Sequence, residues 1–207
     1  KDGKEFKAVQ TGGPSGGCIT KDQLDVKIDY ESLGAIGSMM GSGGMIVMDE
    51  DNCMVDIAKF YLEFTVEESC GKCTPCRVGN KRLHEMLTKI SEGKGTMEDL
   101  DAMRELAQTI KDTSLCGLGQ TAPNPVLSTL NFFGDEYIAH VQDKICPAGA
   151  CQSLLKYMIT EEKCIGCTKC AKVCPVSCIS GKVKEKHVID QNQCIKCGAC
   201  FDACPVN

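Results

Sequence analysis

The chain lacks a basic surplus and a long apolar run, and each absence excludes a class of function. Among its 207 residues, 23 Lys and Arg stand against 28 Asp and Glu, which gives a net charge of −5. A nucleic-acid-binding domain would show a basic excess instead. No apolar stretch approaches the length that a bilayer-spanning helix needs. We therefore expect a soluble chain with no nucleic-acid contacts and no membrane span, large enough for two small domains.

Two further features are missing, a secretion signal and a nucleotide-binding loop. The chain begins at Lys1 with polar sequence and stops soon after the Cys204-Pro205 pair, so we expect it to be part of a longer polypeptide. Glycines crowd residues 11–17 and 41–44, yet neither the P-loop pattern nor GxGxxG followed by a helix is present. These glycines are therefore expected to form turns.

Cysteine is abundant, with 17 residues. In a short secreted chain this number would indicate a disulfide scaffold. Three observations argue against that interpretation: there is no secretion signal, the number is odd, and most cysteines lie in tight runs with two residues between neighbours. Such clustering indicates metal ligation in a reducing compartment, which we take to be the cytoplasm.

The pattern along the chain predicts an α+β protein. Short apolar runs between glycine turns predict strands within residues 1–48. Residues 49–143 carry apolar positions at helical spacing and predict a four-helix-type bundle. Asp51 or Asn52 is expected to cap its first helix, and Thr96 with Asp99 its third. Residues 144–159 are expected to be a linker with a short helix over 152–158, and residues 160–207 form a separate repeated domain.

The repeated domain contains two copies of one unit, each with the pattern C-x2-C-x2-C-x3-C-P. This pattern is typical of bacterial ferredoxins with two 4Fe-4S clusters, in which the fourth cysteine of each copy ligates the other cluster. Zinc is the alternative, but zinc sites pair two C-x2-C knuckles instead. The predicted ligands are Cys164, Cys167, Cys170 and Cys204 for one cluster, and Cys194, Cys197, Cys200 and Cys174 for the other.

A third cysteine triplet leads into the second predicted helix, which begins at Thr74-Pro75. Cys70, Cys73 and Cys76 have the same two-residue gaps, and the candidate fourth ligand is Cys116, directly after the third predicted helix. Cys76 falls in a first helical turn, where free N–H groups favour an anionic group such as a thiolate-ligated 4Fe-4S cluster. Spacing alone leaves a structural zinc open, because C-x2-C suits zinc as well.

Five cysteines remain outside these patterns: Cys18, Cys53, Cys146, Cys151 and Cys178. Cys146 and Cys151 follow His140 closely, and Cys53 opens the first predicted helix. We hypothesise that these four side chains bind a structural zinc that anchors the segment before the ferredoxin repeat. The alternative is unliganded thiols in a core and a histidine at the surface. Cys178 is expected to be a small buried apolar residue.

The sequence around the third triplet also resembles a known family. Glu68-Ser-Cys-Gly-Lys-Cys-Thr-Pro-Cys-Arg77, with Ser114-Leu-Cys-Gly-Leu-Gly119, resembles the iron–sulfur helical domain of the flavin- and NADH-binding subunit of complex I and related enzymes. Residues 41–50 resemble the segment before that domain, and residues 7–17 resemble the end of its β-grasp domain. A two-cluster ferredoxin domain placed afterwards is typical of the flavin subunit of NAD-linked hydrogenases, especially electron-bifurcating iron-only hydrogenases.

The resemblance implies cofactors and partners beyond this chain. FMN and NAD(H) would bind in a part of the polypeptide that is not present here, and FMN would exchange electrons with the cluster of Cys70, Cys73, Cys76 and Cys116. The implied partners are a hydrogenase catalytic subunit, a small 2Fe-2S subunit and soluble ferredoxin. We therefore expect an electron relay through three 4Fe-4S clusters, within an oxidoreductase and without catalytic side chains in this segment.

Three alternatives to this function stay open. The first is the flavin (diaphorase) subunit of an NAD-dependent formate dehydrogenase or of a complex I-like enzyme. The second is a free-standing ferredoxin carrier, against which the helical domain argues. The third is an assembly module in which the clusters are structural and stay unreduced at physiological potentials.

Overall fold

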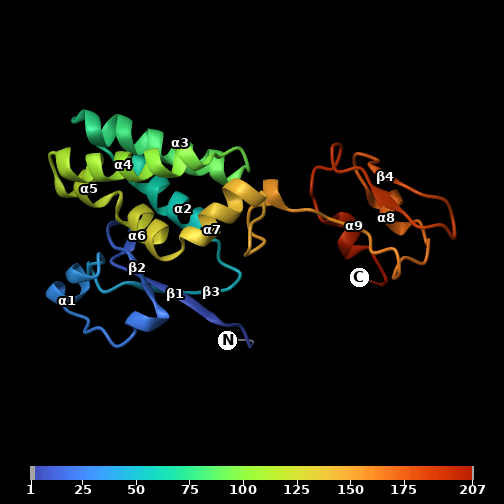
Figure 1. The fold of residues 1–207 in the computed structure, drawn as a ribbon, viewed down its shortest axis with the longest axis horizontal. Helices are drawn as coiled ribbons and strands as arrows, with labels where there is room; N and C mark the ends of the chain where they lie inside the picture. Colours follow the sequence, from blue (N-terminus) through green and yellow to red (C-terminus); the bar gives the residue numbers. More distant parts are fainter. Residues whose placement is uncertain (1–2, 207) are drawn as a thin grey trace. The chain divides into compact units, whose positions relative to one another are not determined.

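The computed structural model describes residues 3–206, and the chain divides into two compact units (Figure 1). The first unit ends at Leu154 and the second begins at Leu155. Each unit has its own buried clusters of apolar side chains. The division falls within residues 144–159, the stretch where the sequence predicts a linker.

The first unit begins with a three-stranded antiparallel sheet of order β2-β1-β3. Its strands are β1 (Phe6–Thr11), β2 (Cys18–Thr20) and β3 (Met45–Asp49). The glycine run between β1 and β2 makes a tight turn: Gly12 has a φ of 71°, and a Cβ on Gly16 would lie 1.7 Å from the carbonyl oxygen of Thr11. Only glycine fits such a turn, so the prediction of turns is confirmed here.

Short helical segments also form in this region, and the sequence pattern did not predict them. They are η1 (Gly13–Ser15), η2 (Lys21–Gln23) and α1 (Tyr30–Ala35). The Asp29 side chain caps α1, since it accepts a hydrogen bond of 2.7 Å from the N–H of Ser32. A helix of six residues shows too little periodicity to be recognised from its apolar positions.

Helices and helical turns make up the rest of the first unit. They are α2 (Met54–Glu67), η3 (Pro75–Gly79), α3 (Asn80–Ser91), α4 (Met97–Thr113), α5 (Gly117–Thr121), α6 (Asn124–Phe132), α7 (Gly134–Ile138), η4 (Ala139–Asp143) and η5 (Gln152–Leu154). The turns η3 and η4 are π-helical. Helix α3 packs against both α2 and α4. Its Leu83, Leu87 and Ile90 are fully buried, and each contributes about 1.5–3 kcal/mol by leaving water.

Two predicted helix boundaries are wrong and one is confirmed. Helix α2 is capped by neither Asp51 nor Asn52, because its N-cap residue is Cys53 and the Asn52 side chain binds the N–H of Asp49 at 2.9 Å. Residues 152–158 form only the single turn η5, since so short a helix is not stable without packing along its length. The capping box of Thr96 and Asp99 is present at the start of α4.

Side-chain contacts join the sheet to the helices of the first unit. The Ser128 hydroxyl of α6 accepts from the N–H of Cys18 at 3.1 Å. The Asn124 amide donates to the carbonyl of Ser15 at 2.8 Å. A small sheet with strands this short is marginally stable alone, so packing on α6 holds the sheet in place.

The second unit is small and repeats one arrangement twice. It contains α8 (Lys169–Val173), β4 (Ile179–Ser180), β5 (Val188–Ile189) and α9 (Ala199–Asp202). The strands pair antiparallel, with Ile179 opposite Ile189. These two strands form a small hairpin whose connection covers residues 181–187. Among residues 3–206 there is no helix whose length and apolar character would let it span a membrane.

Candidate metal centres

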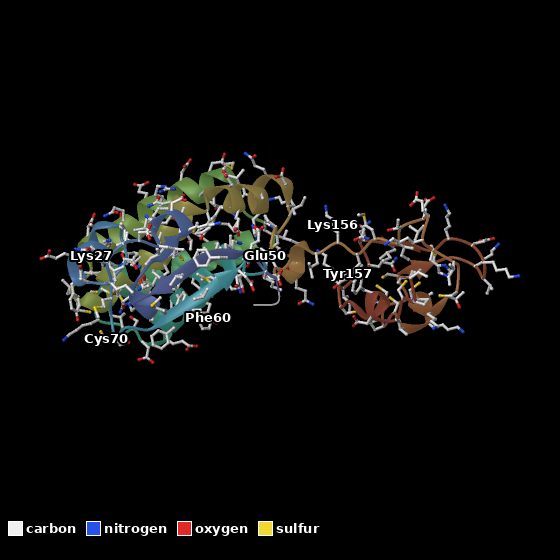
Figure 2. The ribbon with its side chains drawn as sticks, turned by 90° about the horizontal axis from the view of Figure 1, so that it is seen from below. Lys27, Glu50, Phe60, Cys70, Lys156 and Tyr157 are labelled. Carbon is white, nitrogen blue, oxygen red and sulfur yellow. The ribbon has the colours of Figure 1, made fainter. Side chains whose placement is uncertain are left out.

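One cavity of the second unit is lined by the first predicted set of four cysteines. Cys164, Cys167, Cys170 and Cys204 border a space of about 260 Å³. Both apolar and polar residues of this unit also line it, among them Tyr157 (Figure 2), Lys163 and His187. Three of the cysteines come from the loop before α8 and its first turn, whereas Cys204 follows α9. The fold therefore carries the fourth thiol across from the other copy.

A second, narrower cavity is lined by the other predicted set. Cys194, Cys197 and Cys200 border it together with Cys174, which follows α8. Ile179 and Ile189 of the β4–β5 pair also line this cavity, with other apolar side chains. In both cavities the three loop cysteines of one copy are joined by the cysteine that precedes proline in the other copy; Cys200 also borders the first cavity, and Cys178 the second.

Glycine makes both cysteine loops possible. Gly166 has a φ of 65°, and a Cβ there would lie 2.6 Å from the carbonyl oxygen of Glu185. Gly198 has a φ of 79°, and a Cβ there would lie 3.0 Å from the Tyr157 hydroxyl. A left-handed conformation and a close neighbour both favour glycine, so each loop can close tightly around its cavity.

Backbone N–H groups and burial act on the thiols of the second unit. Burial raises the pKa of Cys170 and of Cys200. Burial also opposes ionisation of Cys174, but backbone N–H groups of residues 176–178 together hold its pKa below the usual value. The N–H of Lys196 donates to the Cys194 sulfur at 3.4 Å. Such donors favour the thiolate, which is the form that ligates metal.

The third group of cysteines lies in the first unit, around the π-helical turn η3. Cys76 is buried within η3, while Cys70 is exposed at the surface of the unit (Figure 2). A backbone hydrogen bond from Leu115 lowers the pKa of Cys73. A Cβ on Gly119 would lie 3.0 Å from the Cβ of Cys76. The loop that carries Cys116 is therefore packed against the Cys70–Cys76 loop, although 40 residues separate Cys76 from Cys116.

Two polar side chains beside Cys76 were missed at the level of sequence. The Ser69 hydroxyl lies 3.3 Å from the Cys76 sulfur, and the Asn80 amide donates to that sulfur at 3.4 Å. The available signal was spacing, because residues four apart on a helix are neighbours and Asn80 follows Cys76 by four.

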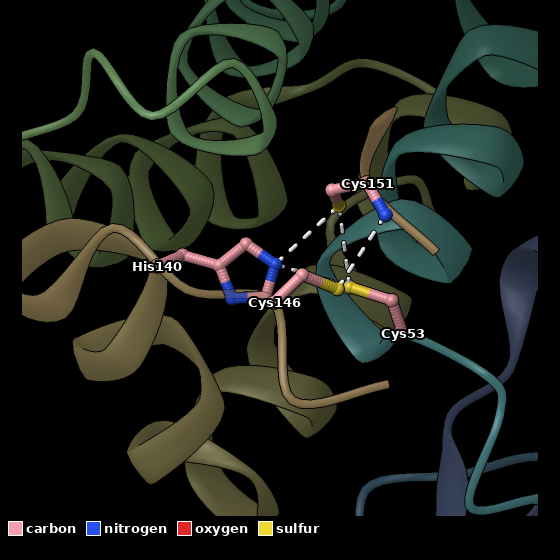
Figure 3. A group of neighbouring side chains, drawn as sticks. All are labelled: Cys53, His140, Cys146 and Cys151. Carbon is pink, nitrogen blue, oxygen red and sulfur yellow. Dashed lines mark hydrogen bonds between the residues drawn. The ribbon is translucent and has the colours of Figure 1, made fainter. Parts of the chain in front are cut away.

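A separate group of four side chains meets in the first unit (Figure 3). These are the four residues of the zinc hypothesis, Cys53, His140, Cys146 and Cys151, and all are buried. Their ligand atoms lie within 4.8 Å of one another. Cys53 is the N-cap of α2, His140 lies in η4, and the other two lie in the loop that follows.

The spacing of these donor atoms suits a single tetrahedral ion. The Cys53 sulfur lies 3.7 Å from the Cys151 sulfur and 3.3 Å from Nε2 of His140. Tetrahedral bonds of about 2.3 Å to sulfur would put two thiolates about 3.8 Å apart. His140 Nδ1 donates to the carbonyl of Glu136 at 2.7 Å, so in the neutral ring Nε2 presents its lone pair to the sulfurs.

The electrostatics of this group favour one ionised thiol. Hydrogen bonds with Cys151 and His140, against the opposing effect of burial, lower the pKa of Cys53. The hydrogen bond to Cys53 and burial raise the pKa of Cys151. Burial disfavours the His140 imidazolium, yet its contact with Cys53 raises the His140 pKa overall. A bound cation would replace the protons of these closely spaced thiols and balance the negative charge of the thiolates.

The two remaining cysteines belong to different units. Cys18 is fully buried in β2, where its thiol donates to the Gln10 side chain at 3.2 Å and burial raises its pKa to about 12. Cys178 is also buried, as the sequence predicts, and its sulfur lies 3.5 Å from that of Cys174.

Comparison with known proteins gives two family matches. Residues 56–140 match the NADH-ubiquinone oxidoreductase-F iron-sulfur binding region. Residues 157–207 match the 4Fe-4S dicluster domain. The two matches divide the chain close to the boundary between the two structural units.

Individual relatives agree with these matches. The NADP-reducing hydrogenase subunit HndC of Solidesulfovibrio fructosivorans is 64% identical over 186 residues, which cover 90% of this chain and 38% of the relative. The alpha subunit of the NAD-reducing hydrogenase HoxS of Cupriavidus necator is 38% identical over 136 residues, which cover 65% of this chain and 21% of the relative. The chain thus spans between about a fifth and two fifths of these curated relatives.

A solved structure is similar as well. The crystal structure of an NAD+-reducing [NiFe]-hydrogenase in the H2-reduced state aligns with a TM-score of 0.61 and 31% identity. The alignment covers 67% of this chain and 24% of the chain in that structure.

Proposed function

Because this chain is the iron–sulfur region of an F-like member of the NADH-ubiquinone oxidoreductase family, joined to a 4Fe-4S dicluster domain, we propose that it relays single electrons in an NAD(P)-linked hydrogenase. The relay would link a flavin to a hydrogenase catalytic subunit through three 4Fe-4S clusters. The observation that carries the proposal is the pair of cavities in the second unit, each lined by the three loop cysteines of one copy together with the cysteine that precedes proline in the other copy.

The donor sets fit the clusters by their chemistry. We assign Cys164, Cys167, Cys170 and Cys204 to one cluster, Cys194, Cys197, Cys200 and Cys174 to the second, and Cys70, Cys73, Cys76 and Cys116 to the third. Four cysteine thiolates are the usual ligands of a 4Fe-4S cubane. The packing of Leu115 and Gly119 on the Cys70–Cys76 loop supports Cys116 as the fourth ligand of the third cluster.

When bound, a 4Fe-4S cluster supplies a one-electron couple whose potential depends on hydrogen bonds, charge and burial. The residues of this chain set those conditions. Backbone N–H groups of residues 176–178 stabilise the Cys174 thiolate. Ile179 and Ile189 supply apolar walls to the second cavity, and Gly166 and Gly198 let the loops close.

The partners are inferred from the relatives' names and the family resemblance. We propose that FMN and NAD(H) bind in the part of the relatives' sequence that this chain does not cover. The further partners would be a small 2Fe-2S subunit and soluble ferredoxin, in the cytoplasm. Electron bifurcation, the β-grasp origin of the sheet and the assignment of residues 49–143 to a four-helix-type bundle stay predictions.

Iron and sulfide analysis with EPR tests the relay. Anaerobically purified protein should hold about twelve iron atoms per chain and show three reducible clusters. Cys116→Ser should lose about four of these iron atoms and only the signal of the third cluster. Cys18→Ser is the matched control, because Cys18 is buried outside every proposed ligand set. Colourless protein without acid-labile sulfide, or a full iron content in Cys116→Ser, would contradict the assignment.

We also propose that Cys53, His140, Cys146 and Cys151 hold a structural zinc. The geometry supports this, because four buried donors lie within 4.8 Å of one another and His140 is oriented by the Glu136 carbonyl. Cys151 lies three residues before the end of the first unit in sequence. The zinc would therefore act as an anchor or hinge at the base of the segment that leads to the dicluster domain. Unchanged zinc content after replacing Cys146 and Cys151 with Ser would reject the proposal.

A further inference from the structure

The Cys76 sulfur receives an unusual set of side-chain donors. The Ser69 hydroxyl approaches it to 3.3 Å and the Asn80 amide nitrogen to 3.4 Å. At Cys194 of the second unit, by contrast, a hydrogen bond comes from the backbone N–H of Lys196. Backbone donors are fixed by the fold, whereas side-chain donors can be changed one at a time.

Asn80 is an energetically unfavourable residue at its buried position. It is fully buried at the start of α3, and its Oδ1 has no hydrogen-bond partner among the described residues. A buried acceptor without a partner destabilises the fold. An apolar side chain of similar size would avoid that penalty, so core packing does not account for an amide here.

The orientation of the Asn80 amide follows from its neighbour. A thiolate only accepts hydrogen bonds, so the amide must turn its N–H group toward the Cys76 sulfur and leave Oδ1 unpaired. The backbone supports this placement, because the N–H of Asn80 donates to the carbonyl of Cys76. Packing of Gly79 on Ile110 of α4 fixes the turn, since a Cβ on Gly79 would lie 2.6 Å from Ile110 Cγ1.

A second unpaired group shares Gly119 as a neighbour with Cys76. The Ser114 hydroxyl is buried and has no hydrogen-bond partner among the described residues. A Cβ on Gly119 would touch both this hydroxyl, at 2.5 Å, and the Cβ of Cys76, at 3.0 Å. The Ser114 hydroxyl can donate, so an acceptor such as a cluster sulfur atom would satisfy it, whereas Asn80 Oδ1 is itself an acceptor and stays unpaired.

We propose that Asn80, assisted by Ser69, is a positioning residue that raises the reduction potential of the cluster held by Cys76. The inference rests on the proposed function, because it requires the third cluster to be present. An N–H donor withdraws negative charge from the ligating sulfur. The reduced cluster, which carries one more negative charge, is therefore stabilised more than the oxidised cluster. This makes the third cluster a better electron acceptor than it would be beside an apolar residue.

The test is an EPR-monitored redox titration of Asn80→Leu, which keeps size and removes the donor. Reduction of the third cluster should become about tenfold less favourable, which for one electron is a downward shift of about 59 mV. Asn80→Asp should shift the potential further, because a carboxylate repels the thiolate. Ser69→Ala, at a half-buried position, should shift it in the same direction by less.

Internal controls separate this inference from its rivals. The two clusters of the second unit should keep their potentials in every variant. The melting temperature of Asn80→Leu should stay equal or rise, whereas a purely structural role predicts a fall. Unchanged potentials of the third cluster in Asn80→Leu and Ser69→Ala would overturn the inference. If Asn80→Leu does not bind the cluster, the potential of the third cluster in Ser69→Ala decides: an unchanged value overturns the inference. Absence of the third cluster from the unmodified protein would instead refute the proposed function.

Discussion

The proposed zinc site gives the sharpest prediction for stability. Replacing Cys146 with Ser removes one soft ligand with little change in size. The remaining Cys53, His140 and Cys151 would then hold zinc too weakly to retain it. We expect the variant to lose zinc and its first unit to melt at a lower temperature than that of the unmodified protein.

The size of the effect follows from how the site is built. The four donors come from the start of α2, from η4 and from the loop after η4, so the ion would tie together segments 87 residues apart in sequence. A ligand present at 100 to 1,000 times its dissociation constant stabilises the folded state by about 2.7–4.1 kcal/mol. A domain of this size shifts its melting temperature by about 2–4 °C per kcal/mol. The expected fall is therefore about 5–16 °C.

The assay is calorimetry of the Cys146→Ser variant and the unmodified protein, each with zinc and with a chelator, together with metal analysis. Added zinc should raise the melting temperature of the unmodified protein and leave that of the variant unchanged. Cys18→Ser is the control for loss of a buried thiol, and it should respond to zinc like the unmodified protein. If the unmodified protein holds no zinc, or melts alike with zinc and chelator, the proposed site is refuted.

Four further predictions concern single residues. Gly166→Ala should lose one cluster of the second unit, measured as about four iron atoms fewer per chain, because a Cβ there would lie 2.6 Å from a carbonyl oxygen; full iron content would contradict this. Leu87→Ala should cost about 2–5 kcal/mol in denaturant unfolding, since the side chain is fully buried; a cost below that range would mean that the core collapses around the gap. Burial opposes ionisation of Asp99, but hydrogen bonds from Lys89 and Thr96 lower its pKa from 3.8. The ionised carboxylate therefore stabilises the folded state fully above pH 3.8, and this stabilisation is lost as the pH falls through the lowered pKa. Asp99→Ala should therefore cost about 1 kcal/mol at neutral pH and less in acid, and an equal cost at both pH values would show that the carboxylate is not responsible. Burial raises the pKa of Cys18 to about 12, so iodoacetamide should not modify it at neutral pH in the folded protein, and its rapid alkylation would show that the sheet opens.

Short-range sequence patterns predicted the local parts of this protein well. The apolar stripe of α3 and the capping box of α4 are present where spacing placed them, because both depend only on residues within one or two turns. The helix expected over residues 152–158 did not form, and α1 was missed. Segments this short gain little from their own backbone hydrogen bonds, so tertiary contacts decide whether they become helical.

The sequence by itself determined which thiols share a loop, since gaps of two residues fix the geometry of Cys164–Cys170 and of Cys194–Cys200. It also determined the repeat that carries Cys174 and Cys204 to the opposite copy. Only the tertiary structure decided that Cys53 meets a loop 98 residues later at Cys151, and that an amide from Asn80 faces Cys76 inside a core. Spacing controls neighbours along the chain, whereas contacts between distant segments arise when apolar helices pack and bring their ends together.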